Sequence, residues 1–214
     1  MGIRSVRAVV ECSRELGIPY LTLYAFSTEN WGRPAAEVNT LMALLREFLV
    51  KELPELRARG IRLRVIGEVA KLPALVREIL DATVSATAGG REMTLTLALS
   101  YAGRNEIARA ARQLAAEAAS GAVSPEAITE EDLAARLDTA GMPDPDLVVR
   151  TSGEVRVSNF LLWQAAYAEF VFTDVLWPDF GKAEFLQVLD EYARRDRRFG
   201  LTGEQDEPPN GGAS

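Results

Sequence analysis

The chain has 214 residues, of which 48% are hydrophobic and 26% charged, and this composition predicts one soluble domain with a sizeable core. The net charge of −7 argues against non-specific binding to nucleic acid, which depends on many contacts from lysine and arginine to phosphates. One cysteine and no histidine exclude an internal disulfide, a cysteine zinc cluster and histidine-based catalysis, while the lack of a membrane-length apolar run or signal sequence favours a cytoplasmic protein.

Hydrophobic periodicity predicts helices and strands that alternate along the chain. The expected elements in chain order are helix 3–16, strand 20–26, helix 35–59, strand 61–67, helix 73–87, strand 93–101, helix 105–119, a short helix near 130–138, strand 146–149, helix 160–168, strand 169–173 and helix 182–198. Cys12 is expected to be a small packing residue, and Pro54 is expected to kink or interrupt its helix. This order predicts an α/β fold, a single domain with a largely parallel β-sheet and flanking helices over residues 1–200, followed by a disordered tail at 201–214.

Polar residues follow three of the predicted strands, after Phe26, Tyr101 and Val149. The carboxyl ends of parallel strands share one edge of a sheet, and α/β proteins bind ligands there. We therefore expect these three clusters to lie on one rim. The first cluster, Ser27–Asn30, is either a binding loop or an ordinary loop in which Trp31 anchors the rim to the core.

The exit of strand 146–149 has the clearest anion-binding chemistry. Arg150 leaves the strand, Arg156 follows six residues later, and Ser158-Asn159 forms a helix N-cap pair before the predicted helix 160–168. Arginine side chains match phosphate oxygens and helix N-termini attract anions, so this pattern predicts a phosphate or diphosphate site. The alternative is a surface arginine pair beside an ordinary helix cap.

Three segments, 24–34 (YAFSTENWGRP), 100–106 (SYAGRNE) and 146–180, resemble the isoprenyl transferase family. These enzymes are the cis-prenyltransferases, or undecaprenyl-diphosphate-synthase-like enzymes, and the resemblance extends from the first helix to about Gly200. It implies prenyl transfer, in which isopentenyl diphosphate condenses with an allylic diphosphate to give a cis-polyprenyl diphosphate. Arg104 and Glu106 also match the family pattern, but we expect their role to be structural.

The resemblance also implies roles for individual residues. The implied substrate-binding residues are Ser27, Thr28, Glu29, Trp31, Arg33, Arg150, Arg156, Val157 (through its backbone) and Ser158. Asn30 is implied as the catalytic, proton-accepting residue, and Glu169 as a ligand of Mg²⁺. A neutral carboxamide is a hydrogen-bond partner rather than a base near pH 7, so we expect Asn30 to orient a diphosphate oxygen or water that takes the proton. Mg²⁺ prefers oxygen ligands, which agrees with a chain without histidine.

One feature of the family is expected to be missing. Its members begin with a strand and an Asp-Gly-Asn-Arg-type loop that carries a catalytic, magnesium-binding Asp, whereas this sequence begins at Met1, within the family's first helix. We therefore expect the first strand and phosphate loop to be absent and the activity of this chain to be impaired. The start codon is then placed too late, or the protein is a non-catalytic member that serves as a partner subunit or diphosphate-binding module.

The family resemblance also implies partners. It implies a homodimer, with the aromatic run 160–180 as a candidate interface, and a tunnel for the polyprenyl tail beside helix 35–59. Membrane contact is expected to be at most peripheral, through the lipid product. The basic residues 194–198 either complement the dipole of the last helix or attract a membrane or diphosphate.

Overall fold

The computed structural model describes residues 2–195, in which helices and strands alternate as the sequence predicts as far as α4. The helices are α1 (Gly2–Glu15), α2 (Ala35–Ala58), α3 (Ala74–Thr87), α4 (Gly103–Ala119), α5 (Glu130–Ala134) and α6 (Lys182–Ala193). The strands are β1 (Tyr20–Ser27), β2 (Ile61–Ile66), β3 (Met93–Tyr101), β4 (Leu147–Arg150) and β5 (Glu169–Phe172). The predicted tail 201–214 and the last residues of the predicted helix 182–198 lie outside the described range.

All strand pairs in the described part of the chain are parallel, but their hydrogen bonds divide them into two sheets. The first has the order β1-β3-β2, and the second contains β4 and β5. In the first sheet β3 lies between two neighbours and is almost wholly buried on both faces, whereas the alternation in its sequence predicts one buried face. The predicted α/β class with parallel strands and flanking helices is confirmed; the difference is that β4 does not hydrogen-bond to the first sheet.

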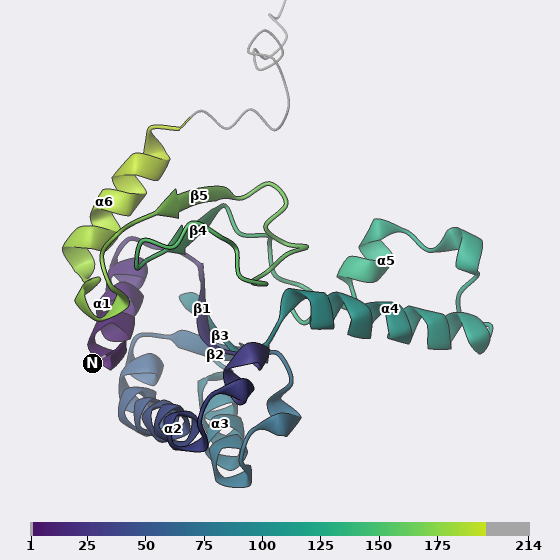
Figure 1. The fold of residues 1–214 in the computed structure, drawn as a ribbon, viewed down its shortest axis with the longest axis horizontal. Helices are drawn as coiled ribbons and strands as arrows, with labels where there is room; N and C mark the ends of the chain where they lie inside the picture. The colour runs from purple at the N-terminus through teal and green to yellow at the C-terminus, as the bar shows by residue number, and fades with distance from the viewer. Residues whose placement is uncertain (1, 196–214) are drawn as a thin grey trace, which may run out of the picture.

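Helices cover the two sheets separately (Figure 1). α2 and α3 lie side by side against the first sheet, and their apolar faces form a core with β1, β2 and β3. α1 and α6 pack together beside the second sheet, where Val9 and Cys12 of α1 meet Val171 of β5 and Phe185 of α6. Cys12 is fully buried, as expected for a packing residue.

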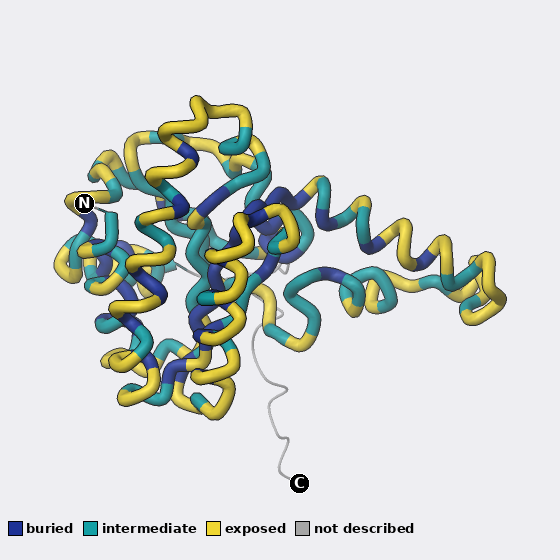
Figure 2. Tube along the Cα trace, turned by 90° about the horizontal axis from the view of Figure 1, so that it is seen from below, coloured by how far each residue is buried: buried dark blue, intermediate teal, exposed yellow. Residues whose placement is uncertain are grey.

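α4 and α5 project from this body (Figures 1 and 2). The base of α4 is fixed by a buried carboxylate: Glu106, only 1% exposed, accepts a hydrogen bond of 2.6 Å from the Tyr101 hydroxyl and one of 2.8 Å from the main-chain N–H of Asp138. The side-chain amide of Gln164 donates to the same carboxylate at 3.2 and 3.3 Å. Glu106 therefore joins the end of β3, the segment after α5 and the loop before β5, in agreement with the structural role expected for it.

Pro54 does not interrupt α2, which is continuous from Ala35 to Ala58. A proline inside a helix costs about 3 kcal/mol, partly through a lost hydrogen bond. Leu49 and Leu56 on either side of Pro54 are both buried in the core, and each contributes roughly 1.5–3 kcal/mol on burial. Core packing on both sides of the proline therefore maintains the helix.

The helix predicted at 160–168 is wrong, because these residues form successive turns. Ser158, Asn159 and Leu161 have φ angles of 50°, 62° and 44°, which a right-handed helix excludes. Asn159 does cap a helix, but a different one: its Oδ1 accepts a 2.9 Å hydrogen bond from the main-chain N–H of Arg104 at the start of α4. The anion site therefore has no helix N-terminus directly after Ser158.

Candidate active site

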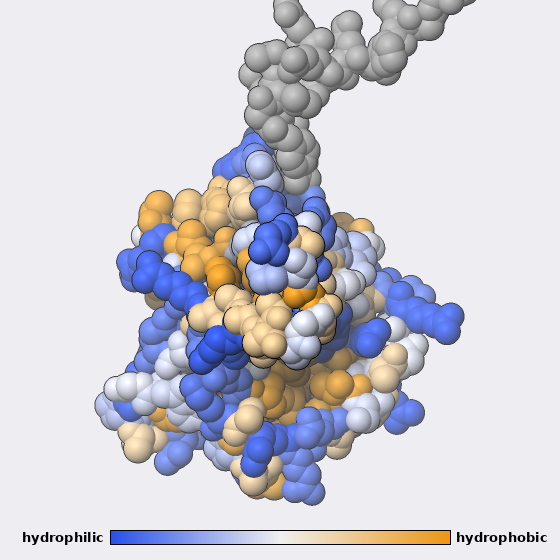
Figure 3. All heavy atoms as spheres, turned by 90° about the vertical axis from the view of Figure 1, so that its right-hand side faces the viewer, coloured by the Kyte–Doolittle hydropathy of each residue, from blue (hydrophilic) through white to orange (hydrophobic). Residues whose placement is uncertain are grey.

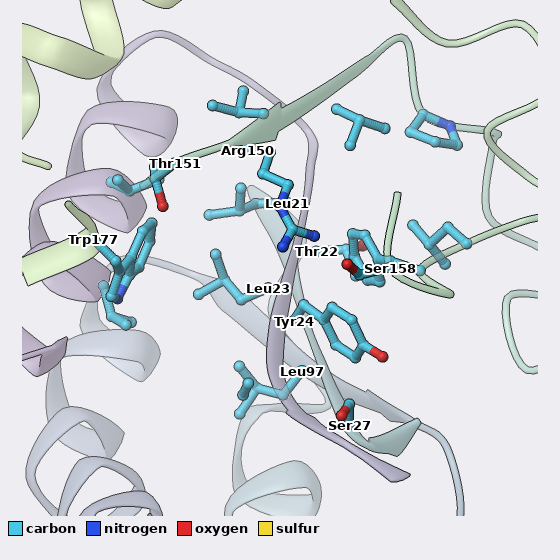
Figure 4. Close-up of a pocket in the computed structure, with 18 of the residues that line it drawn as sticks. Leu21, Thr22, Leu23, Tyr24, Ser27, Leu97, Arg150, Thr151, Ser158 and Trp177 are labelled. Carbon is cyan, nitrogen blue, oxygen red and sulfur yellow. The ribbon is translucent and has the colours of Figure 1, made fainter. Parts of the chain in front are cut away.

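A cavity of about 1540 Å³ lies between β1 and β4 (Figure 4). Every residue from Ile18 to Ser27, and every residue from Asp144 to Ser152, borders it. Successive side chains of a strand point to opposite faces, so a cavity bordered by all of them runs along the strand edges. In the described part of the chain β1 pairs only with β3, and β4 only with β5, so both of these edges are open to the cavity.

One part of the cavity is apolar. Its lining comes from α1, α2, β1 and β3, and includes Ile3, Val6, Leu21, Leu23, Leu41, Leu44, Leu45, Phe48, Leu97 and Leu99. Figure 4 shows Leu21 and Leu23 of β1 and Leu97 of β3 along one side of this space. A hydrocarbon chain that enters such a lining gains about 0.8 kcal/mol for each buried CH₂.

The other part is polar and contains most of the residues that the sequence singled out. Those that border the cavity are Ser27, Glu29, Asn30, Arg33, Arg150, Arg156, Val157 and Ser158. Segments more than a hundred residues apart in sequence therefore meet at one space. Thr28, Trp31 and Glu169 do not border it.

Asn30 closes the turn that follows β1. Its Oδ1 accepts a 2.9 Å hydrogen bond from the main-chain N–H of Ser27, and its own N–H donates to Ser27 Oγ at 3.3 Å. This reciprocal cap occupies the carbonyl oxygen of the Asn30 side chain, while its Nδ2 has no hydrogen-bond partner among residues 2–195. The amide is thus arranged to donate a hydrogen bond into the cavity, which agrees with an orienting role better than with a proton-accepting one.

The arginines at the cavity differ in their counter-ions. Arg33 pairs with Glu37 at 2.5 Å, and Arg156 pairs with Glu154. The guanidinium of Arg150 has no hydrogen-bond or ion-pair partner in the described chain, and the side chain of Arg104 has none either. Two arginines that form no ion pair within residues 2–195 therefore border a cavity of an acidic protein, which favours an anionic ligand.

Arg104 was not predicted as a site residue, although it borders the cavity. Arg104 lies just after the end of β3, as the other polar site residues lie at or after the ends of β1 and β4. That position was the signal by which the sequence could have identified Arg104 as a site residue. Tyr24 also borders the cavity and was not predicted as a site residue. Its ring stacks on Phe160 with centroids 4.6 Å apart, and burial is the main reason that the pKa of Tyr24 rises to about 12, which keeps the phenol neutral.

Trp31 and Thr28 have contacts within the protein. The Trp31 ring packs edge-on against Phe26 at 4.9 Å, and its Nε1 donates to Ser100 Oγ at 2.9 Å. Thr28 donates to Glu29 Oε2 at 3.1 Å. The geometry of Trp31 corresponds to the alternative considered for this segment, an anchor between the loop and the core.

Glu169 lies at the opposite end of its strand pair from the arginine site. It opens β5 opposite Leu147, whereas Arg150 lies opposite Phe172, so about 10 Å of strand separates the two positions. Glu169 Oε2 accepts a 2.8 Å hydrogen bond from Arg195. Residues 2–195 contain no group of three or more acidic, cysteine or histidine side chains arranged to hold a metal ion. The residues described here do not form a complete magnesium site by themselves.

Comparison with known proteins identifies the family. Residues 1–200 match the family model described as putative undecaprenyl diphosphate synthase. The chain is 49% identical to the isoprenyl transferase of Agrobacterium fabrum over 95% of this chain and 83% of that protein. It is 50% identical to the isoprenyl transferase of Chlorobaculum tepidum over 95% of this chain and 77% of that protein.

Two solved structures share the fold. Lavandulyl diphosphate synthase from Lavandula x intermedia, in complex with dimethylallyl diphosphate, has a TM-score of 0.90 at 35% identity, over 93% of this chain and 86% of that one. A probable undecaprenyl diphosphate synthase from Campylobacter jejuni has a TM-score of 0.81 at 35% identity, over 93% and 91%. The chain therefore belongs to the isoprenyl transferase family and is a prenyl-transferring enzyme of the cis-prenyltransferase type.

Proposed function

We propose that this protein condenses isopentenyl diphosphate with an allylic diphosphate to form a cis-polyprenyl diphosphate. The observation that carries the proposal is one cavity in which Arg150, which has no counter-ion within residues 2–195, shares a space with an extended apolar lining. A prenyl diphosphate has the matching chemistry, an anionic head and a hydrocarbon tail. Arginine binds the head through charge-assisted hydrogen bonds, and burial of CH₂ groups holds the tail.

The proposed roles of the polar residues follow the family resemblance. Arg150, Arg156 and Ser158, with the backbone of Val157, hold the diphosphate of isopentenyl diphosphate. The segment Ser27–Arg33 contributes to the same polar end, where Ser27, Glu29, Asn30 and Arg33 border the cavity. Thr28 and Trp31 support this segment through the hydrogen bonds described above.

In the reaction, the alkene of isopentenyl diphosphate forms a carbon–carbon bond to C1 of the allylic substrate while the C1–oxygen bond breaks and diphosphate leaves. A proton then leaves the condensed product to form the new cis double bond. Cationic side chains stabilise the departing diphosphate. The Asn30 amide donates through Nδ2 to a diphosphate oxygen or water, and that oxygen accepts the proton.

We further propose that Mg²⁺ assists, by neutralising charge on the departing diphosphate. Mg²⁺ is usually bound through one or two carboxylates together with substrate phosphates and water, so it does not require a complete protein cage. Glu169 is the proposed carboxylate; it lies outside the cavity and about 10 Å of strand from Arg150, so it would have to leave Arg195 and approach the diphosphate to hold the ion. Titration of Mg²⁺ with pyrophosphate into the wild type and into Glu169→Gln tests this, because weaker binding in the variant is the expected result.

A homodimer and a cytoplasmic location are also proposed. Between Glu154 and Leu176 the exposed large apolar side chains include Val155, Tyr167 and Leu176, which are 73%, 74% and 56% exposed. Hydrophobic residues lie among hydrophilic ones on the face that Figure 3 shows. Light scattering on the full chain tests dimerisation.

No helix of residues 2–195 is both long and apolar enough to cross a membrane, and any membrane contact is proposed to be through the lipid product alone.

The decisive experiment is incorporation of radiolabelled isopentenyl diphosphate, with farnesyl diphosphate as starter and Mg²⁺, by the 214-residue chain. Label in a longer prenyl product that is lost in Arg150→Met supports the proposal. Binding of isopentenyl diphosphate without turnover would instead favour a diphosphate-binding partner subunit. Failure to bind either diphosphate would contradict both functions.

A further inference from the structure

Asn159 lies where three segments of the polar site meet. Its side-chain N–H group donates to Glu29 Oε1 at 3.0 Å, and its Oδ1 accepts from the main-chain N–H of Arg104 at 2.9 Å. Its main-chain carbonyl also accepts from the N–H of Gly103 at 2.7 Å. One residue thus joins the turn after β1, the start of α4 and the loop that follows β4.

The backbone at Asn159 fits these contacts closely. Ser158 and Asn159 both have left-handed φ angles, a conformation that asparagine tolerates better than most residues. Gly103 packs against this turn so tightly that a Cβ there would lie 2.8 Å from Leu162 Cγ and 3.2 Å from the Asn159 carbonyl oxygen. The chain reversal directly after Ser158 is therefore fixed from several sides.

The hydrogen bonds of Asn159 join the two halves of the polar site, the Arg150–Ser158 loop and the Ser27–Arg33 segment. Arg156 and Ser158 belong to a loop without regular secondary structure, and Glu29 belongs to a separate turn. Within residues 2–195, the side-chain hydrogen bond between that loop and that turn is the one from Asn159 to Glu29. The same contact is the main reason that the pKa of Glu29 lies below its ordinary value. A site of this kind depends on supporting residues, because a displacement of about 1 Å costs on the order of 100-fold in rate.

We propose that Asn159 is a positioning residue of the diphosphate site, which sets the distance between the Arg150–Ser158 loop and the Ser27–Arg33 segment by hydrogen bonds to Glu29 and α4. The proposal rests on the function proposed above. Asn159 acts through Glu29 and through the backbone of its own loop, whereas Arg150 and Ser158 contact the ligand.

Exchange of the donor and the acceptor tests this directly. Asn159→Gly keeps the left-handed backbone and the net charge but removes both side-chain hydrogen bonds. Asn159→Asp keeps the acceptor for Arg104 N–H but places a second carboxylate beside Glu29. The double variant Asn159→Asp/Glu29→Gln reverses the hydrogen bond, because the new amide at 29 donates to the new carboxylate at 159, and it has the net charge of the wild type.

The measurement is calorimetric binding of inorganic pyrophosphate to the full chain, together with Tm. We expect Asn159→Gly to weaken binding about tenfold, Asn159→Asp to weaken it further, and the double variant to return to within about threefold of the wild type. Asn39→Asp, at an exposed α2 position away from the cavity, is the matched charge control and should bind like the wild type.

The outcomes separate the two proposals. If the wild type binds pyrophosphate and Asn159→Gly binds equally well, or if the double variant recovers no more binding than the separate effects of Asn159→Asp and Glu29→Gln predict, the positioning role is refuted. A merely structural role lowers Tm without recovery of binding in the reversed pair. Absence of pyrophosphate binding by the wild type would instead refute the diphosphate site itself.

Discussion

Replacement of Arg150 by methionine should weaken diphosphate binding while leaving the fold intact. The Arg150 guanidinium borders the cavity and has no hydrogen-bond or ion-pair partner in the described chain, so its removal leaves no protein group unpaired. A hydrogen bond to a charged group contributes about 1.5–3 kcal/mol, which corresponds to a loss of about 10- to 150-fold in Kd. The free energy of unfolding should change by less than about 0.5 kcal/mol, as for a surface substitution.

Calorimetric titration with inorganic pyrophosphate measures the first effect, and urea denaturation measures the second. Arg62→Met is the matched control, because Arg62 is an exposed arginine of β2 that does not border the cavity, and its loss changes the net charge equally. Equal weakening in both variants would show that only the overall charge matters. A large fall in stability of Arg150→Met would show that Arg150 has a structural role, and either result would refute the reasoning.

Three further predictions concern other parts of the structure. Tyr101→Phe should destabilise the protein by about 1–3 kcal/mol in urea denaturation, because buried Glu106 loses its 2.6 Å hydrogen bond, and a change below about 0.5 kcal/mol would contradict this. Burial raises the pKa of the Cys12 thiol, so a thiol reagent at pH 8 should react only after unfolding, and rapid labelling of the native protein would be inconsistent with the buried position. The Asn159 donor lowers the pKa of Glu29 in the folded state, so the stabilising contribution of Glu29 is complete above its ordinary pKa of 4.5 and declines as pH falls through the lowered value. The difference in unfolding free energy between wild type and Glu29→Gln should shrink over that acidic range, and a difference independent of pH would exclude this linkage.

The sequence predicted the helices and strands best where a single periodicity runs over many residues. The alternation in 93–101 identifies β3, and the apolar stripe of α2 identifies a core helix despite Pro54. Local pattern failed at 160–168, where the N-cap residue and apolar run suit a helix. The competing contacts come from residues distant in sequence, since Asn159 caps α4 and Phe160 stacks on Tyr24, and no local pattern contains that information.

In the candidate site, too, the sequence predicted what local pattern determines and not what depends on distant residues. Ser27, Asn30 and Arg150 belong to polar clusters that follow predicted strands, the family resemblance implied their roles, and the structure brings them to one cavity. The division of the strands into two sheets and the pairing of Glu169 with Arg195 were not predictable, because they depend on which strand edges and which helix ends meet in three dimensions.

The ion pair between Arg156 and Glu154 would have to open before the Arg156 guanidinium could bind a ligand. Arg156 is 63% exposed in this pair, and exposed pairs contribute only about 0–1 kcal/mol, so an incoming anion can displace the carboxylate easily. A monoanion forms an ion pair with Arg156 of about the same strength as the pair with Glu154, so the free energy of the exchange is close to zero. A diphosphate offers several oxygens and more charge to Arg156 than a monoanion does, so it should compete with the Glu154 carboxylate more effectively.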